Sequence, residues 1–119
     1  MTVIAPPACC PSSFLQGNLV PQGSTVLLCL HGDIDVDTTD HLAHLFAHAT
    51  AGTPGDVVVD LAGVDFLGAA GVRALLIHAE DLDRRHLRLQ VVNPRPLIHE
   101  VLRIGGVPVT DTAETLPCP

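Results

Sequence analysis

The alternation of apolar and polar residues along the chain predicts a protein built from both strands and helices. Short apolar runs bounded by turn residues, and one segment of strict alternation, have the pattern of strands in a sheet. These predicted strands are Phe14–Val20, Thr25–His31, Val57–Val59 and Leu87–Val92. A last short strand is expected over 107–110.

Three other segments repeat apolar residues at the three- to four-residue spacing of a helix. They cover about 39–50, 69–83 and 93–105. Thr38 or Thr39 can cap the first helix, and Asn93 followed by Pro94 has the pattern of a cap for the third. The residues expected on the buried faces are Leu42, Leu45, Phe46, Ala49, Val72, Leu75, Leu76, Ala79, Leu82, Leu97, Ile98, Val101 and Leu102.

The order of these segments, β-β-α-β-α-β-α-β, predicts one α/β domain over 14–110. Its sheet is expected to be mixed and mainly parallel, with four to five strands packed against about three helices. Prolines predict a disordered leader over 1–13 and a short C-terminal tail over 111–119.

Composition narrows the possible partners. The chain has 119 residues, and its cationic residues are all Arg, with a net charge of −7. Such an acidic chain is a poor match for nucleic acid or for an anionic membrane. No apolar run approaches the roughly 18 residues of a membrane span, and the first residues lack the basic and apolar regions of a secretory signal. A cytoplasmic location is therefore expected.

The four cysteines do not form a zinc-binding pattern. Cys9 and Cys10 are adjacent, Cys118 is the penultimate residue, and no CxxC spacing occurs. Cys29 lies in a predicted core strand, where it is expected to act as a small buried apolar residue. No metal or cofactor is expected at any of them.

Asp33, Asp35 and Asp37 alternate in an acidic segment after the second predicted strand. An EF-hand calcium loop would need Glu at the twelfth position, but the twelfth residue from Asp33 is His44. A solvated acidic loop is the simpler interpretation. The functional alternative is a contact with a partner's Arg or Lys.

His41, His44 and His48 fall at i, i+3 and i+7 of the first predicted helix. The i, i+4 pair has the spacing of zinc ligands on a helix, but the Glu of HExxH is absent. These residues are weak metal candidates, and a solvent-facing row is the preferred interpretation. Titration between pH 6 and 7 is a further option.

Sequence patterns of catalysis are missing. The Ser residues occur in the leader and in a turn, and neither GxGxxG nor a Walker A motif is present. The chain is therefore not expected to be an enzyme.

The junction Gly68-Ala69-Ala70-Gly71 follows an apolar run and opens a predicted helix. Such a turn can present bare backbone N–H groups to an anion, although the side chains here offer no chemistry of their own. On the next turns of the helix, Arg73 and Ile77 are expected to face away from the buried side.

Two stretches carry a resemblance to a known family. They are LCLHGDIDVDTTDHL and VVVDLAGVDFLGAAGVRALL. The chain resembles the STAS domain family, which includes bacterial anti-sigma-factor antagonists, over about residues 14–110. The family has a G-[ED]-[LI]-D turn, which 32–35 matches. It also has F-[ML]-D-S-S-G-L at a helix start, where Phe66-Leu67 and Gly71-Val72 match.

The resemblance implies a partner and a missing switch. Family antagonists bind an anti-sigma factor with a histidine-kinase-like ATPase fold and carry a phosphorylatable Ser at the second Ser of D-S-S-G. That position is Ala70 in this chain, with Gly68 and Ala69 before it. The resemblance therefore implies a regulator that binds its partner without being phosphorylated at the usual place.

Two other functions stay open at this point. One is a STAS-type accessory subunit of a larger complex, such as a lipid-transport ATPase. The other is a metal- or pH-responsive module that uses the histidines. For the leading hypothesis, the expected partner-binding residues are Asp33, Asp35, Asp37, Gly68, Ala69, Ala70, Gly71, Arg73 and Ile77.

Overall fold

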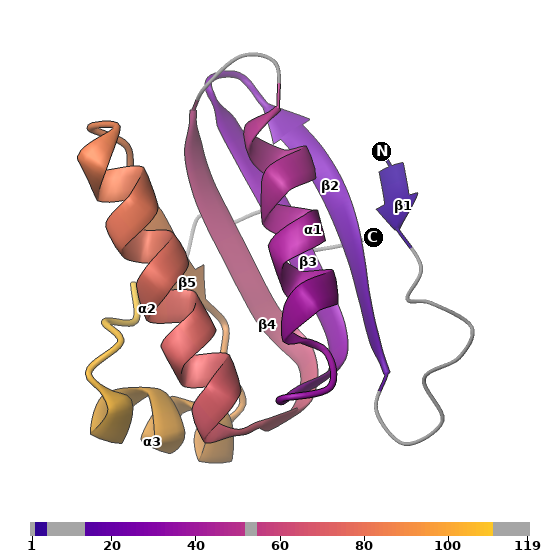
Figure 1. Cartoon of the computed structure of the whole chain (residues 1–119), viewed down its shortest axis with the longest axis vertical. Coiled ribbons are helices and arrows are strands. Elements are labelled where there is room, and N and C mark those ends of the chain that lie inside the picture. Colours follow the sequence, from indigo (N-terminus) through magenta and orange to yellow (C-terminus); the bar gives the residue numbers. More distant parts are fainter. Residues whose placement is uncertain (1, 5–13, 52–54, 111–119) are drawn as a thin grey trace.

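The computed structural model describes residues 2–4, 14–51 and 55–110. Five strands form a single sheet, and helices α1 and α2 lie side by side over one of its faces (Figure 1). Helix α3 lies at the lower end of the molecule in this view, beside the start of α2. The expected single α/β domain with a mixed sheet and three helices is confirmed.

The strands follow one another across the sheet in chain order, β1-β2-β3-β4-β5. Their bounds are β1 Thr2–Ile4, β2 Leu15–Gln22, β3 Thr25–Ile34, β4 Asp56–Leu67 and β5 Leu89–Val92. The β1–β2 and β2–β3 pairs are antiparallel, whereas the β3–β4 and β4–β5 pairs are parallel. A two-residue turn joins β2 to β3, and its Gly23 has the positive φ of 63° that such hairpins require.

The helices are α1 Thr39–Thr50, α2 Ala69–Arg84 and α3 Pro96–Gly105. Helix α1 connects β3 to β4, α2 connects β4 to β5, and α3 follows β5. Both α1 and α2 therefore start at the end of the sheet where β3 and β4 finish. None of the helices in the described part of the chain has the length and apolar character needed to cross a bilayer.

Some boundaries differ from the sequence expectations. Thr2–Ile4 pairs with β2 instead of belonging to a disordered leader, because β-branched residues favour strands. Residues 5–13 and the tail 111–119 lie outside the described residues. Residues 107–110 do not form a strand, although the Thr110 N–H donates to the Val91 carbonyl at 2.8 Å. Helix α3 starts at Pro96 and not at Pro94, because Asn93 takes a left-handed conformation with φ of 56°.

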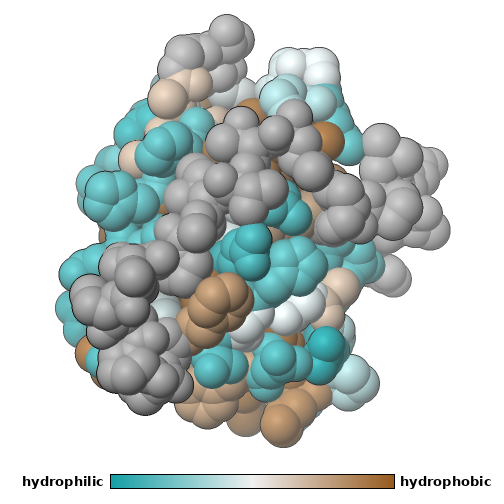
Figure 2. Space-filling model, turned by 90° about the vertical axis from the view of Figure 1, so that its right-hand side faces the viewer, coloured by the Kyte–Doolittle hydropathy of each residue, from teal (hydrophilic) through white to brown (hydrophobic). Residues whose placement is uncertain are grey.

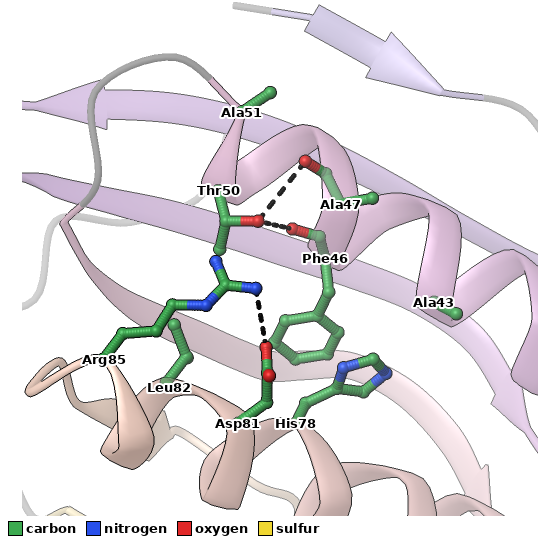
Figure 3. A pocket seen from close by; sticks show the side chains of 9 residues that line it. All are labelled: Ala43, Phe46, Ala47, Thr50, Ala51, His78, Asp81, Leu82 and Arg85. Carbon is green, nitrogen blue, oxygen red and sulfur yellow. Dashed lines mark hydrogen bonds and ion pairs between the residues drawn. The ribbon is translucent and has the colours of Figure 1, made fainter.

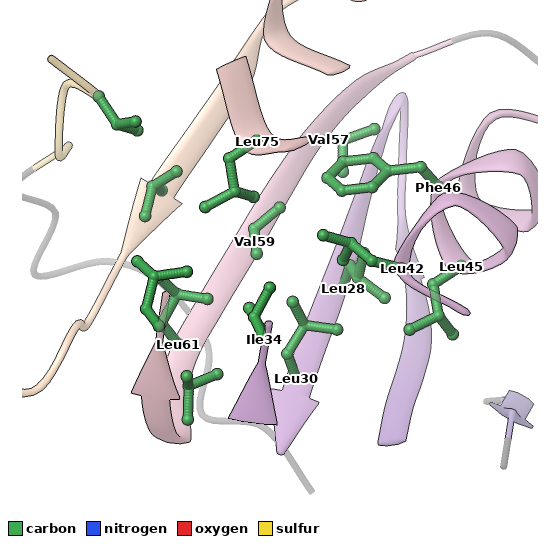
Figure 4. Packing of buried hydrophobic residues seen from close by; sticks show 14 of the residues in the cluster. Leu28, Leu30, Ile34, Leu42, Leu45, Phe46, Val57, Val59, Leu61 and Leu75 are labelled. Carbon is green, nitrogen blue, oxygen red and sulfur yellow. The ribbon is translucent and has the colours of Figure 1, made fainter. Parts of the chain in front are cut away.

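The core lies between the sheet and the helices (Figure 4). Leu42, Leu45 and Phe46 of α1 face Leu28 and Leu30 of β3, and all five side chains are at most 3% exposed. Aliphatic side chains make up nearly all of this cluster. Removing them from water is the main force that holds the two layers together.

Cys29 is buried as expected, with 1% of its surface exposed. It is also disulfide-bonded, whereas a free thiol was expected from the sequence. The other three cysteines lie outside the described residues.

A buried carboxylate fastens the β5–α3 connection to β4. Asp60 is 3% exposed, and its carboxylate accepts hydrogen bonds from the Ala62 N–H at 2.8 Å and the Asn93 amide at 3.1 Å. Arg95 then donates to the Ala62 carbonyl at 3.0 Å and pairs with Asp65 at 2.6 Å. These bonds fix the N-terminal end of α3 against the end of β4.

Candidate functional site

The lower end of the molecule in Figure 1 brings together the ends of β3 and β4 and the starts of α1 and α2. Gly68 is the single residue between β4 and α2. Its N–H donates to the Ile34 carbonyl at 2.9 Å, so the start of α2 is tied directly to the end of β3. We call this region, formed by residues 33–38 and 66–73, the lower-end surface.

The junction residues have different roles. Gly71 is buried, and a Cβ added there would lie 2.6–2.7 Å from atoms of Ile34 and Leu67, so only glycine fits without rearrangement. Gly68 occupies the N-cap position of α2 without a side-chain cap. Ala69 is exposed and Ala70 is half-buried. The site thus presents methyl groups and backbone at a helix start, and no hydroxyl.

The acidic loop between β3 and α1 is shaped by Thr38. The Thr38 hydroxyl donates to the Asp33 carbonyl at 2.9 Å and accepts from the Asp35 N–H at 3.0 Å. Thr38 is 2% exposed and occupies the N-cap position of α1, but its side chain makes no capping hydrogen bond to the helix. The prediction of a side-chain cap at Thr38 is therefore wrong. The hydroxyl instead stabilises the loop, because the Asp33 carbonyl and the Asp35 N–H both lie within hydrogen-bonding distance. The Thr39 hydroxyl also turns back to the loop, to the Val36 carbonyl at 3.3 Å.

The loop and the junction lie against each other. A Cβ added to Gly68 would lie 3.8 Å from the Cβ of Asp35. The Asp35 carboxylate accepts a hydrogen bond from the Asp37 N–H at 2.9 Å, which turns the loop. Two motifs that are more than 30 residues apart in the sequence therefore form one surface.

Arg73 and Ile77 lie on successive exposed turns of α2. Ile77 is 53% exposed. Four of the six Arg residues are held in ion pairs with Glu80, Asp81, Asp65 and Glu100. Within the described residues, Arg73 makes no ion pair, so the lower-end surface carries its unneutralised positive charge.

Exposed apolar residues that were not among the expected site residues gather at the same end. The Phe14 carbonyl accepts a hydrogen bond from the Asp33 N–H at 2.7 Å. Val36 lies in the acidic loop, and Phe66 lies beside Gly68. Their side chains are 51%, 73% and 51% exposed. Figure 2 shows apolar surface at the lower end of the molecule. A Val placed between acidic residues was the sequence signal that could have identified this feature.

The three histidines of α1 do not form one row. His41 is buried, with 8% of its surface exposed, whereas His44 and His48 are exposed. The Nδ1 atom of His48 lies 2.9 Å from the His44 carbonyl of the same helix. In the described ranges, no group of three or more His, Cys, Asp or Glu side chains is placed to hold a metal ion. The expected solvent-facing row is corrected because His41 falls beside the apolar stripe.

A groove of about 260 Å³ lies between α1 and α2, toward their C-terminal ends (Figure 3). The rings of Phe46 and His78 stack there with centroids 4.2 Å apart, and Asp81 pairs with Arg85 at 2.9 Å. Burial lowers the pKa of His78 below its ordinary value of 6.5, and the Asp81 carboxylate opposes this effect. The groove is distant from the lower-end surface, and its charged groups already neutralise each other.

The comparisons with known proteins agree with this architecture. The sequence model of a STAS family described as "Mlab, STAS domain" matches residues 18–109. A Mycobacterium tuberculosis protein named "Putative anti-anti-sigma factor Rv2638" is 30% identical over 112 residues, which cover 88% of this chain and 75% of that protein. The "Anti-sigma-F factor antagonist RsfA" of the same species is 28% identical over 110 residues, covering 87% and 86% of the two chains.

Solved structures share the fold. An anti-sigma factor antagonist from Mycobacterium paratuberculosis superposes with a TM-score of 0.73 at 23% identity, covering 84% of this chain and 88% of that chain. The unphosphorylated form of the anti-sigma factor antagonist SpoIIAA gives a TM-score of 0.69 at 20% identity, covering 82% and 89%. The chain belongs to the STAS domain family, and it resembles the anti-sigma-factor antagonists within it.

Proposed function

We propose that this protein is an anti-sigma-factor antagonist that binds a kinase-type anti-sigma factor through its lower-end surface. The observation that carries the proposal is the contact of the acidic loop with the start of α2, where Asp35 lies against Gly68. Carboxylates, exposed apolar side chains and the Arg73 charge then lie together on one surface. Antagonists among the similar proteins support the choice of partner.

The proposed partner has the histidine-kinase-like ATPase fold. Its binding face would carry Arg or Lys opposite the acidic loop and small or aliphatic residues opposite Ala69 and Ala70. Such an arrangement gives complementary charge at the edge and close apolar contact at the centre, as in stable interfaces generally. The proposed role is regulatory and not catalytic, and its proposed location is the cytoplasm.

Ala70 would occupy the position of the phosphorylatable Ser. A methyl group has no oxygen to accept a phosphoryl group. A phosphoserine at this place would add nearly two negative charges beside an acidic loop, and like-charge repulsion and desolvation would oppose docking. With Ala70, the surface stays in the state that binds.

Calorimetric titration against each kinase-type anti-sigma factor of the host tests the proposal. We expect the wild-type chain to bind at least one of them. Ala70→Asp should weaken binding at least tenfold, because it adds a charge at the centre of the surface, whereas Ala70→Ser should bind as the wild type does. If the wild-type chain binds none of the anti-sigma factors, the proposal is wrong.

The missing switch has a separate test. The Gly68→Asp/Ala70→Ser double variant restores an acceptor hydroxyl and a capping carboxylate. Incubated with ATP and an anti-sigma factor that has kinase activity, this variant should become phosphorylated and lose affinity, while the wild type stays unmodified at residue 70. A phosphorylated variant that binds as tightly as the unmodified one would show that the junction has only a structural role.

A second candidate function is an accessory subunit of a larger complex, such as a lipid-transport ATPase. The family match described as "Mlab, STAS domain" is the observation that favours it, since that description is not the name of an antagonist. Co-purification of the tagged chain with a membrane complex, rather than with an anti-sigma factor, would select this function.

A further inference from the structure

Helix α3 is apolar on two sides. Ile98 and Leu102 are at most 3% exposed and pack into the core. Leu97 and Ile104, by contrast, are each 74% exposed. These two residues are seven positions apart, so they share one face of the helix, with the half-buried Val101 between them. The expectation that Leu97 lies in the core is therefore wrong.

The helix that carries this stripe packs against the lower-end surface. A Cβ added to Gly105 would lie 2.5 Å from Cγ1 of Val72, so the end of α3 packs directly on the first turn of α2. At its other end, the Arg95–Asp65 ion pair holds α3 against the end of β4. Figure 1 shows α3 at the same end of the molecule as the junction.

The stripe is too short to form a stable interface by itself. A helix of ten residues is about 15 Å long. A stable interface usually buries about 800 Å² on each partner, far more than one face of such a helix. Two copies of the chain, each with a net charge of −7, would also repel each other. The stripe therefore fits best as one part of a larger contact that includes the neighbouring surface.

We propose that Leu97, Val101 and Ile104 form the apolar anchor of the partner-binding surface. This inference rests on the proposed function: the occupant is the same anti-sigma factor that contacts the acidic loop. The partner contacts α3 with aliphatic or aromatic side chains while its cationic groups face the loop. Large apolar side chains that become buried at an interface contribute more affinity than charges at its solvated edge.

The test is a Leu97→Gln/Ile104→Gln double variant of the full chain. Gln is a good helix former, and both positions are exposed, so the unfolding transition should stay close to that of the wild type. In calorimetric titration with the anti-sigma factor that the wild type binds, we expect the Kd to rise at least tenfold. The matched control, His99→Gln/Arg103→Gln, changes the other exposed edge of α3 and should leave the Kd within twofold.

Hydrogen exchange on the wild-type chain gives a second measurement that needs no variant. The partner should slow exchange of the amides over 96–105 as well as those at the start of α2. If the wild type binds but the double variant has the same Kd, this inference is wrong and the proposed function stands. The same holds if the partner binds but does not slow exchange in α3. If the wild type binds no anti-sigma factor, both fail. A free protein that sediments as a dimer and becomes monomeric in the double variant would show that the stripe is a self-association surface instead.

Discussion

At the scale of single residues, the lower-end surface depends on a few short contacts. Thr38 connects the start and the middle of the acidic loop through one hydroxyl. The sequence could identify Thr38 as a residue at a helix start. It could not show that the hydroxyl faces the loop, because that depends on the path of the chain after β3.

Thr38→Val removes this hydroxyl at nearly constant shape. The Asp33 carbonyl and the Asp35 N–H then lose a partner in a part-buried place. Leaving such groups unsatisfied costs about 1–3 kcal/mol, so the free energy of unfolding in urea should fall by that amount. Thr39→Val is the control, since its longer 3.3 Å bond is exposed, and it should change stability by less than about 0.5 kcal/mol. Equal losses for both variants would contradict the special role of Thr38.

Gly71→Ala tests the close packing of α2 on the sheet. The added methyl would meet the Ile34 carbonyl at 2.7 Å, and a backbone atom cannot move aside easily. Overpacking costs about 1–3 kcal/mol, while the better helix propensity of Ala returns at most about 1 kcal/mol. We therefore expect a net loss of stability by urea unfolding.

Gly68→Ala is the control for Gly71→Ala. The nearest atom to its methyl would be a ring carbon of the half-exposed Phe66 at 3.1 Å, and this side chain can turn away. A change within about 0.5 kcal/mol is expected. A Gly71→Ala variant as stable as the wild type would mean that the start of α2 can shift on the sheet.

At the scale of elements, α1 and α2 contact each other through an aromatic pair. His78 stacks on Phe46, and burial lowers the pKa of His78. The unfolded chain therefore binds this proton more readily than the folded chain does. The contribution of the neutral ring to stability is complete above the ordinary pKa of 6.5 and is lost as the pH falls from there toward the lower folded pKa.

We expect urea unfolding to show lower stability at pH 5.5 than at pH 7.5. His78→Phe keeps an aromatic ring against Phe46 without a titrating group, so its stability should change less over the same interval. A wild-type chain with the same pH dependence as His78→Phe would mean that another group causes the loss.

The helices and strands could be predicted from the spacing of apolar residues, because each segment contains its own helical or strand periodicity. The face of α3 that is buried could not be predicted in this way. Leu97, Val101 and Ile104 recur at helical spacing just as Ile98 and Leu102 do, so the pattern alone supports either face. Gly105 lies on the same side of α3 as Ile98 and Leu102 and packs closely against Val72, a tertiary contact that no local pattern contains.

At the scale of the whole molecule, the surface joins segments from distant parts of the chain. Phe14, Val36, Phe66 and α3 lie at the same end of the molecule, because the parallel strands β3, β4 and β5 all end there and the antiparallel β2 starts there. The acidic loop and the junction could be selected from the sequence as separate motifs. Their contact, and the exposed apolar residues around them, follow from the order of the strands and not from any local pattern.

The net charge of −7 should also affect how fast the proposed partner binds. If cationic groups of the anti-sigma factor face the acidic loop, the association rate should fall as salt rises from 50 to 300 mM. The triple variant Asp33→Asn/Asp35→Asn/Asp37→Asn keeps the oxygen acceptors and removes the charges, so its rate should depend less on salt. Stopped-flow mixing measures both rates. An equal salt dependence for both proteins would exclude the loop as the source of the attraction.

The single-residue link between β4 and α2 has a consequence for the course of binding. Gly68 is bonded to the end of β3, and Gly71 is packed against Ile34 and Leu67, so the start of α2 cannot move apart from the sheet. A surface held in this way has little conformational entropy to lose when it is covered. Its encounter with a partner should therefore occur in one step, as rigid bodies, without a slow rearrangement on this side of the complex.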